Sequence, residues 1–194
     1  MHLPTALLTL FITLSLSDSA PTLSTRQAKA CFVIGSTALP AEVQDTVTTI
    51  QSAVTCDTST TTLSGVPDTV SGNTYFSSIN FASSSSSTPL AFALSEFATD
   101  TPLASTSLSL FQDQLNVYQA TEAGIRSVDG NLAIKAPKFF LSFQMARINT
   151  AQGTAITDPG QTVEHLLGKV VKNAGSAESQ ATKDAVAALA GSLA

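Results

Sequence analysis

The fold is decided by residues 107–150, which have the sequence SLSLFQDQLNVYQATEAGIRSVDGNLAIKAPKFFLSFQMARINT. The first half repeats apolar residues at helical steps: Leu108, Phe111, Leu115, Tyr118 and Ile125. Residues at this spacing share one face of an α-helix, so the pattern predicts an amphipathic helix that ends near 128. After a turn at 129–131, residues 138–148 are apolar on nearly all sides, which indicates a second helix covered by other elements.

Other helices are indicated by residues that favour helix N-termini. Residues 88–91 and 101–104 are two copies of TPLA, and threonine followed by proline suits the N-cap and the first helical position. The first copy predicts a helix, and the second predicts a turn before the long helix. Pro137 is expected to start the phenylalanine-rich helix, Asp158 and Pro159 a further helix, and residues 181–190 a last, alanine-rich helix.

The N-terminal third combines one helix with strands. Pro40 suits a helix start, and apolar residues at 43, 47, 50 and 54 predict a helix that runs to Cys56. Residues 31–34 are expected to be a strand or an extended segment. Residues 60–66 and 74–81 are strand-like with turn residues between them. We therefore expect a mainly α fold of five to six helices with a small N-terminal β-hairpin, and the alternative is an α+β fold with more strand.

The N-terminus has the features of a secretory signal. Residues 3–16 are mostly apolar but too few to cross a membrane. We expect a signal peptide over 1–19 with cleavage near 17–20, a flexible leader over 20–29 and a single globular domain over 30–194. A buried N-terminal helix is the alternative for the first segment. The protein would then be secreted, extracellular or in a cell wall, with no membrane span after signal removal.

The sequence contains two cysteines, Cys31 and Cys56. In a secreted chain an even pair most simply forms a disulfide. This bond would close a loop of about 25 residues, which is worth roughly 3 kcal/mol in the chain-entropy model. The alternative is a free catalytic or metal-binding thiol.

Charged residues are sparse and hydroxyl groups are abundant. The formal net charge is −5 and charged residues make up 12% of the chain, against about 25% in ordinary proteins. Serine and threonine number 25 and 26. The acidic balance and the absence of a Lys/Arg cluster in the sequence argue against nucleic-acid binding. The expected partner is an unknown protein or a cell-wall component.

Few residues are available for catalysis or metal binding. Without the signal segment the chain has one histidine, His165, and the sequence has no Glu-x-x-His, no Gly-x-Ser-x-Gly and no P-loop. We therefore expect no cofactor and no metal. At about 100° per residue, His165 lies off the apolar stripe of its helix, which predicts a partly exposed, non-catalytic side chain. A Ser-His-Asp triad assembled from distant residues is the alternative.

Two sets of residues are candidates for a binding site. Glu122 and Arg126 are four residues apart, which favours an exposed ion pair on a wet helix face. The alternative is a buried polar network of Glu122, Arg126 and Arg147 beneath the phenylalanine-rich helix, where it would line a pocket. Phe139, Phe140 and Phe143 could line a pocket for an apolar ligand between helices.

Five segments together resemble a family of small secreted fungal proteins that is known only as a domain of unknown function. They are CFVIG at 31–35, LPAEV at 39–43, FQDQLNVYQATEAGIRS at 111–127, PKFFL at 137–141 and GQTVEHLL at 160–167. The resemblance covers nearly all of the chain after the signal. It implies secretion and a fungal source, and it brings no activity and no catalytic residues.

Three functions fit these features. The first is a secreted, non-enzymatic interaction or cell-surface protein, which the signal, the hydroxyl-rich composition and the lack of a catalytic constellation favour. The second is a carrier of a small apolar ligand, and the third is a hydrolase of unrecognised type. A cavity above about 300 Å³ lined by the three phenylalanines would favour the carrier.

Overall fold

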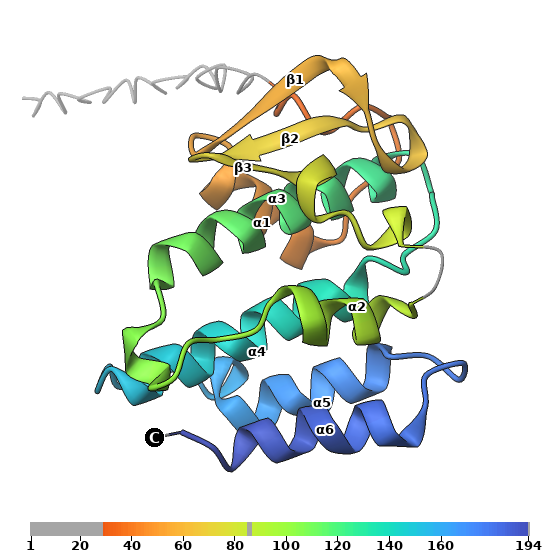
Figure 1. The fold of residues 1–194 in the computed structure, drawn as a ribbon. Helices are drawn as coiled ribbons and strands as arrows, with labels where there is room; N and C mark the ends of the chain where they lie inside the picture. Colours follow the sequence, from red (N-terminus) through yellow and green to blue (C-terminus); the bar gives the residue numbers. More distant parts are fainter. Residues whose placement is uncertain (1–28, 85–86, 194) are drawn as a thin grey trace, which may run out of the picture.

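The computed structural model describes residues 29–84 and 87–193, which form six α-helices and a three-stranded antiparallel sheet (Figure 1). The helices are α1 Ala41–Ile50, α2 Pro89–Glu96, α3 Leu108–Ser127, α4 Lys135–Ala151, α5 Val163–Asn173 and α6 Gln180–Ala190. The strands are β1 Val54–Thr61, β2 Pro67–Ser71 and β3 Thr74–Tyr75, in the order β1-β2-β3. This architecture agrees with the expected mainly α or α+β class. The predicted signal peptide and all but the last residue of the predicted leader lie outside the described residues.

Helix α3 is the centre of the fold. The sheet packs on one side of α3 and α4 packs on the other, while α5 and α6 form the layer farthest from the sheet (Figure 1). α3 is buried on most of its length, including Val117, Ala120 and Ile125. At Gly124 the chain before α1 crosses the helix so closely that a Cβ atom would lie 2.5 Å from the carbonyl oxygen of Phe32.

The predicted helix starts are largely confirmed, because side-chain caps define them. Thr88, Ser107, Thr162 and Ser179 each accept a hydrogen bond from the backbone N–H three residues later. Asp158 caps only a short 3₁₀ turn, Pro159–Gln161, so α5 begins later than predicted, at Val163. α4 begins at Lys135, two residues before Pro137, and the second TPLA copy forms a 3₁₀ turn at Leu103–Ser105.

The predictions for the N-terminal third need correction. The helix predicted to reach Cys56 ends at Ile50, and β1 begins at Val54. Val54 continues the apolar helical spacing, but the threonine-rich segment that follows it has β-branched side chains that favour a strand. The strand predicted over 74–81 is only Thr74–Tyr75, followed by two 3₁₀ turns, and residues 31–34 form a turn and coil instead of a strand.

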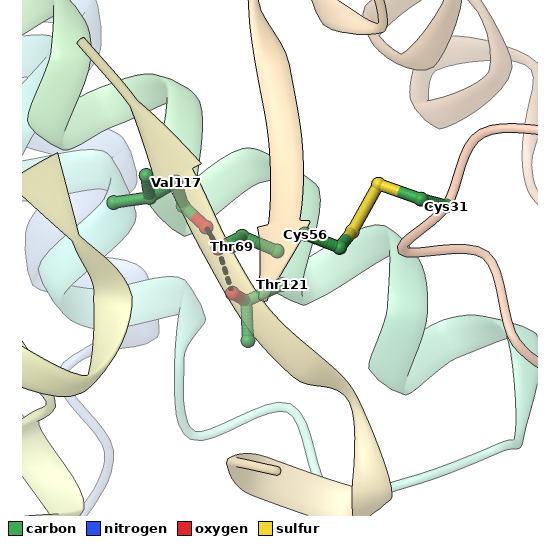
Figure 2. The surroundings of a disulfide bond; sticks show 5 residues. All are labelled: Cys31, Cys56, Thr69, Val117 and Thr121. Atoms are coloured by element: carbon green, nitrogen blue, oxygen red, sulfur yellow. Dashed lines mark hydrogen bonds between the residues drawn. A yellow bond between two sulfur atoms is a disulfide. The ribbon is translucent and has the colours of Figure 1, made fainter. Parts of the chain in front are cut away.

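The sheet is fastened to α3 by buried hydroxyl groups and to the chain before α1 by the two cysteines (Figure 2). The Thr69 hydroxyl donates to the carbonyl oxygen of Val117 at 3.1 Å and lies 2.9 Å from the hydroxyl of Thr121. Cys31 and Cys56 are at disulfide distance, with Cα atoms 6.1 Å apart. The predicted disulfide therefore joins β1 to the segment that precedes α1.

The phenylalanine-rich helix lies in the core as the sequence predicts. Phe140 and Phe143 are fully buried and their ring centroids are 6.0 Å apart. On α3, Tyr118 packs edge-on against Phe76 and Phe97 and donates its hydroxyl to the carbonyl oxygen of Ile79 at 2.6 Å. Burial raises the pKa of the Tyr118 phenol far above its ordinary value, so this hydroxyl remains a hydrogen-bond donor.

Candidate functional site

A cavity of about 560 Å³ opens where α1, α3, α4 and α5 meet. The inner part is formed by half-buried or buried side chains of α3 and α4, such as Glu122, Lys138 and Phe139. The rim is formed by exposed side chains of α1 and α5, such as Glu42 and Lys169. The volume lies in the range of small-molecule sites, which is about 300–1,000 Å³.

The inner wall is organised by the carboxylate of Glu122, whose side chain is 3% exposed. One oxygen of Glu122 accepts from Nε of Arg126 at 2.9 Å, four residues later on α3. The other oxygen lies 2.5 Å from Nζ of Lys138 on α4. The two cations are only 16% and 15% exposed. One carboxylate therefore pairs with two half-buried cations, and these three side chains have a net charge of +1.

Positive charge is concentrated at this cavity. Five of the nine lysines and arginines of the chain line it: Arg126, Lys135, Lys138, Lys169 and Lys172. The carboxylates that line it are Glu42 and Glu122. Five cations and two carboxylates give the lining a net charge of +3, whereas the chain as a whole has −5. The sequence contains no Lys/Arg cluster, and the fold assembles one from three helices.

Three of these lysines form no ion pair with a carboxylate in the part of the chain that the structure describes. Both ion pairs found among the described residues use Glu122, so Lys135, Lys169 and Lys172 make none there. Neutral hydrogen-bonding side chains, including Gln119 and Gln161, complete the lining. The cavity therefore presents unneutralised ammonium groups and amide donors, which are the groups that bind carboxylates and phosphates.

The ring of Phe139 lies close to one inner and one outer cation. The ammonium of Lys138 lies 4.2 Å from the ring centroid of Phe139, and that of Lys169 lies 5.9 Å from the same centroid. Both distances are within the range of cation–π attraction. Burial lowers the pKa of Lys138, and the charge of Glu122 opposes that effect. Lys138 is thus a partly desolvated amine whose charge an added anion would stabilise.

The predicted site residues fall into separate places. Glu122 and Arg126 form the ion pair that their spacing predicts, but the pair is not exposed as expected, because the two side chains are only 3% and 16% exposed in the cavity wall. Arg147 does not join them, because it donates to the carbonyl oxygens of Leu189 at 2.9 Å and Ser192 at 2.8 Å, beyond the other face of α4. Its position nine residues after Lys138 explains this, because about 900° of helical rotation places the two side chains on opposite faces.

The three phenylalanines are also divided. Phe139 lines the cavity, whereas Phe140 and Phe143 are in the solid core and do not line it. His165 is exposed on α5 and lines the rim, which agrees with the predicted exposure.

Sequence reasoning missed the four lysines of the cavity, although a signal for them exists. On α4, residues 135, 138 and 142 are spaced by three and four residues, and on α5 residues 165, 169 and 172 are spaced by four and three. Each set therefore forms a stripe along one helix face. The stripes are short, and only the packing of α4 against α5 brings them to one cavity.

Two other features, a metal-ligand cluster and a membrane-spanning helix, are absent from the part of the chain that the structure describes. No group of three or more His, Cys, Asp or Glu side chains is arranged there to hold a metal ion. Nor does any helix in that part combine the length and apolar character that a membrane crossing requires.

Comparison with known proteins gives one match. The model of a family described as "Domain of unknown function (DUF7143)" matches residues 33–194, which is most of the chain. No curated protein and no solved structure matches.

Proposed function

The chain belongs to the DUF7143 family, for which no function is described, and from the geometry of its cavity we propose that it is a non-enzymatic extracellular protein that binds a small anionic molecule. The ligand would occupy the cavity between α1, α3, α4 and α5. Arg126 and Lys138 would bind its charge from the inner wall and Lys169 and Lys172 from the rim, and the half-buried Lys135 of α4 would add to the positive charge of the lining.

One observation carries this proposal: five of nine basic residues line one cavity in an acidic protein. Like charges gathered at one place repel each other, and a folded protein has no stability reason to collect them. A bound anion would reduce that repulsion. Its hydrogen bonds to water would be replaced by hydrogen bonds from ammonium and amide groups of the cavity. The cations of the inner wall would contribute most, because charge interactions are stronger where water is partly excluded.

The extracellular part of the proposal rests on the cysteine pair and the N-terminal sequence. Disulfides persist in oxidising compartments, and Cys31 and Cys56 are at disulfide distance. Residues 1–19 have the composition of a secretory signal. The proposal also includes a cell-wall location and a macromolecular partner in addition to the small anion.

The two alternative functions have less support from the geometry. A carrier of an apolar ligand would use Phe139, Phe140 and Phe143 together, but only Phe139 reaches the cavity and charged groups surround it. A hydrolase would use His165 as a base. His165 lies at the exposed rim, where the charged side chains that line the same wall of α5 are the cations Lys169 and Lys172.

The direct test measures the binding of small anions to the oxidised protein by calorimetry. The probes are phosphate, citrate and succinate at low ionic strength, with glycerol as the uncharged comparison. We expect the anions to bind and glycerol to give no signal. Replacing Lys169 and Lys172 by Gln should weaken binding, whereas Lys183→Gln, a substitution on α6 outside the cavity, should not. Equal binding in the two variants would place the anion elsewhere and reject the proposal.

A further inference from the structure

Four of the five cations of the cavity form two groups at different depths, and Lys135 belongs to neither. The inner group is Arg126 and Lys138, which share the single carboxylate of Glu122. The outer group is Lys169 and Lys172, one helical turn apart on α5, both exposed and without an ion pair among the described residues. Each group therefore has surplus positive charge of its own.

The distances of Lys138 and Lys169 from the ring of Phe139 set an upper limit on the distance between one inner and one outer ammonium group. The nitrogens of Lys138 and Lys169 lie 4.2 Å and 5.9 Å from its centroid, so they are at most about 10 Å apart, which is the sum of the two distances. Phe139 is half-buried and lines the cavity together with both lysines. The ring offers an apolar surface where a hydrocarbon segment could lie, with an inner and an outer ammonium group near it.

We infer that the ligand is a small organic dianion with two separated acidic groups, one bound by Arg126 and Lys138 and the other by Lys169 and Lys172, with its carbon skeleton against Phe139. This inference rests on the proposed function and specifies its ligand class. A molecule with one acidic group would neutralise only one of the two cation groups. A dianion that spans both would gain two sets of charge-assisted hydrogen bonds within one cavity.

The acidic groups can be carboxylates or phosphates, because guanidinium and ammonium groups bind both. The test therefore uses two homologous series with the full oxidised protein. One series is the linear dicarboxylates from malonate to suberate, each compared with the monocarboxylate of the same carbon number. The other is linear alkanediol bisphosphates, each compared with the corresponding monophosphate.

We expect the best dianion to bind at least about tenfold more tightly than its matched monoanion, with an optimum at one intermediate chain length. The Lys169→Gln, Lys172→Gln double variant should lose this advantage, so that it binds the dianion no more tightly than the matched monoanion. Lys183→Gln should retain the advantage. The two substituted lysines are exposed in the wild type, so the double variant should have the melting curve of the wild type. This measurement verifies that the variant is folded.

The outcomes separate this inference from the proposed function. An advantage in only one series supports the inference and identifies the acidic group. Equal binding of monoanions and dianions in both series would overturn the inference and leave anion binding intact. If no anion of either series binds, both the inference and the proposed function are wrong.

Discussion

The ammonium of Lys138 on α4 and the carboxylate of Glu122 on α3 are joined at 2.5 Å, in the half-buried wall of the cavity. The same carboxylate holds Arg126 through its other oxygen. Glu122 thus links two helices, and its single negative charge compensates only one of the two positive charges beside it.

Glu122→Gln should destabilise the protein by about 3 kcal/mol, because it leaves two partly desolvated cations without a counter-charge. Urea unfolding at low ionic strength measures this change. Phosphate should restore part of the loss in the variant, since it can take the position of the lost charge. The control is Glu42→Gln, an exposed carboxylate of the same cavity, for which the change should stay within about 0.5 kcal/mol. Equal stability of Glu122→Gln and wild type would contradict the assigned role of Glu122.

Anion affinity should fall as the pH rises through the pKa of Lys138. Burial lowers that pKa below 10.5, so Lys138 loses its charge at a lower pH in the folded chain than in the unfolded one. The groups around it are Glu122 and Arg126 on α3, Lys135 on α4 and Lys169 on α5. Titrations of phosphate binding from pH 7 to pH 10, in steps of about one pH unit, measure the effect.

Lys138→Arg is the matched control for this pH dependence. Arginine keeps its charge throughout the accessible range, so the part of the decrease that belongs to Lys138 should disappear. In the ligand-free wild type, the same pKa shift makes the free energy of unfolding rise between the folded pKa and 10.5, because the unfolded chain binds the proton more tightly. A pH profile identical in wild type and variant would exclude Lys138 from anion binding.

Phe140→Ala and Phe139→Ala should have different effects although the residues are neighbours. Phe140 is fully buried in the core, so its truncation should cost about 3–5 kcal/mol of stability. Phe143→Ala should behave in the same way. Phe139 is only half-buried and lines the cavity, so Phe139→Ala should cost less stability and weaken ligand binding. Thermal unfolding measures the loss of stability and calorimetry measures the loss of binding. An unchanged melting point in Phe140→Ala would show that Phe140 is not a core residue.

Cys31 and Cys56 should be resistant to thiol labelling in the unfolded, unreduced protein. The sequence separation is 25 residues, and removing the bond by Cys56→Ser should cost roughly 3 kcal/mol. Mass spectrometry after alkylation measures the labelling, and reduced protein is the positive control. Labelling at both positions without reductant would show that the thiols are free.

His165→Ala should leave the fold and the biological activity unchanged. His165 is exposed at the cavity rim, its backbone N–H donates to the Thr162 side chain, and its imidazole makes no hydrogen bond among the described residues. Comparing melting curves and anion affinities of the variant and the wild type tests this. Loss of an assayable activity with an unchanged melting curve would favour an enzyme over a binding protein.

The sequence predicts the helical part of this fold well because local signals determine it. The caps at Thr88 and Ser107 and the apolar periodicity of α3 specify where those helices begin and which faces are buried. Val54 shows where such signals fail, since its position fits both the end of a helical stripe and the start of a strand. Only its partner in the sheet, Ser71 of β2, resolves the ambiguity.

The site is less predictable because it depends on how helices are rotated against each other. Glu122 and Arg126 are paired by spacing within one helix, which a sequence shows directly. Lys138 and Lys169 come from different helices, and no local pattern specifies that their faces converge. Arg147 is a candidate partner of Glu122 from the sequence, but it donates to Leu189 and Ser192 from the face of α4 opposite Lys138.

The cysteine pair encloses α1 in a covalently closed ring, and α1 supplies Glu42, Val43 and Thr46 to the cavity. The other walls belong to α3, α4 and α5, which lie outside the ring. Insertions or substitutions within the ring can therefore reshape one wall while the cation-bearing walls keep their positions. Within the family, this ring is where divergence could alter the size and selectivity of the cavity without rebuilding the fold.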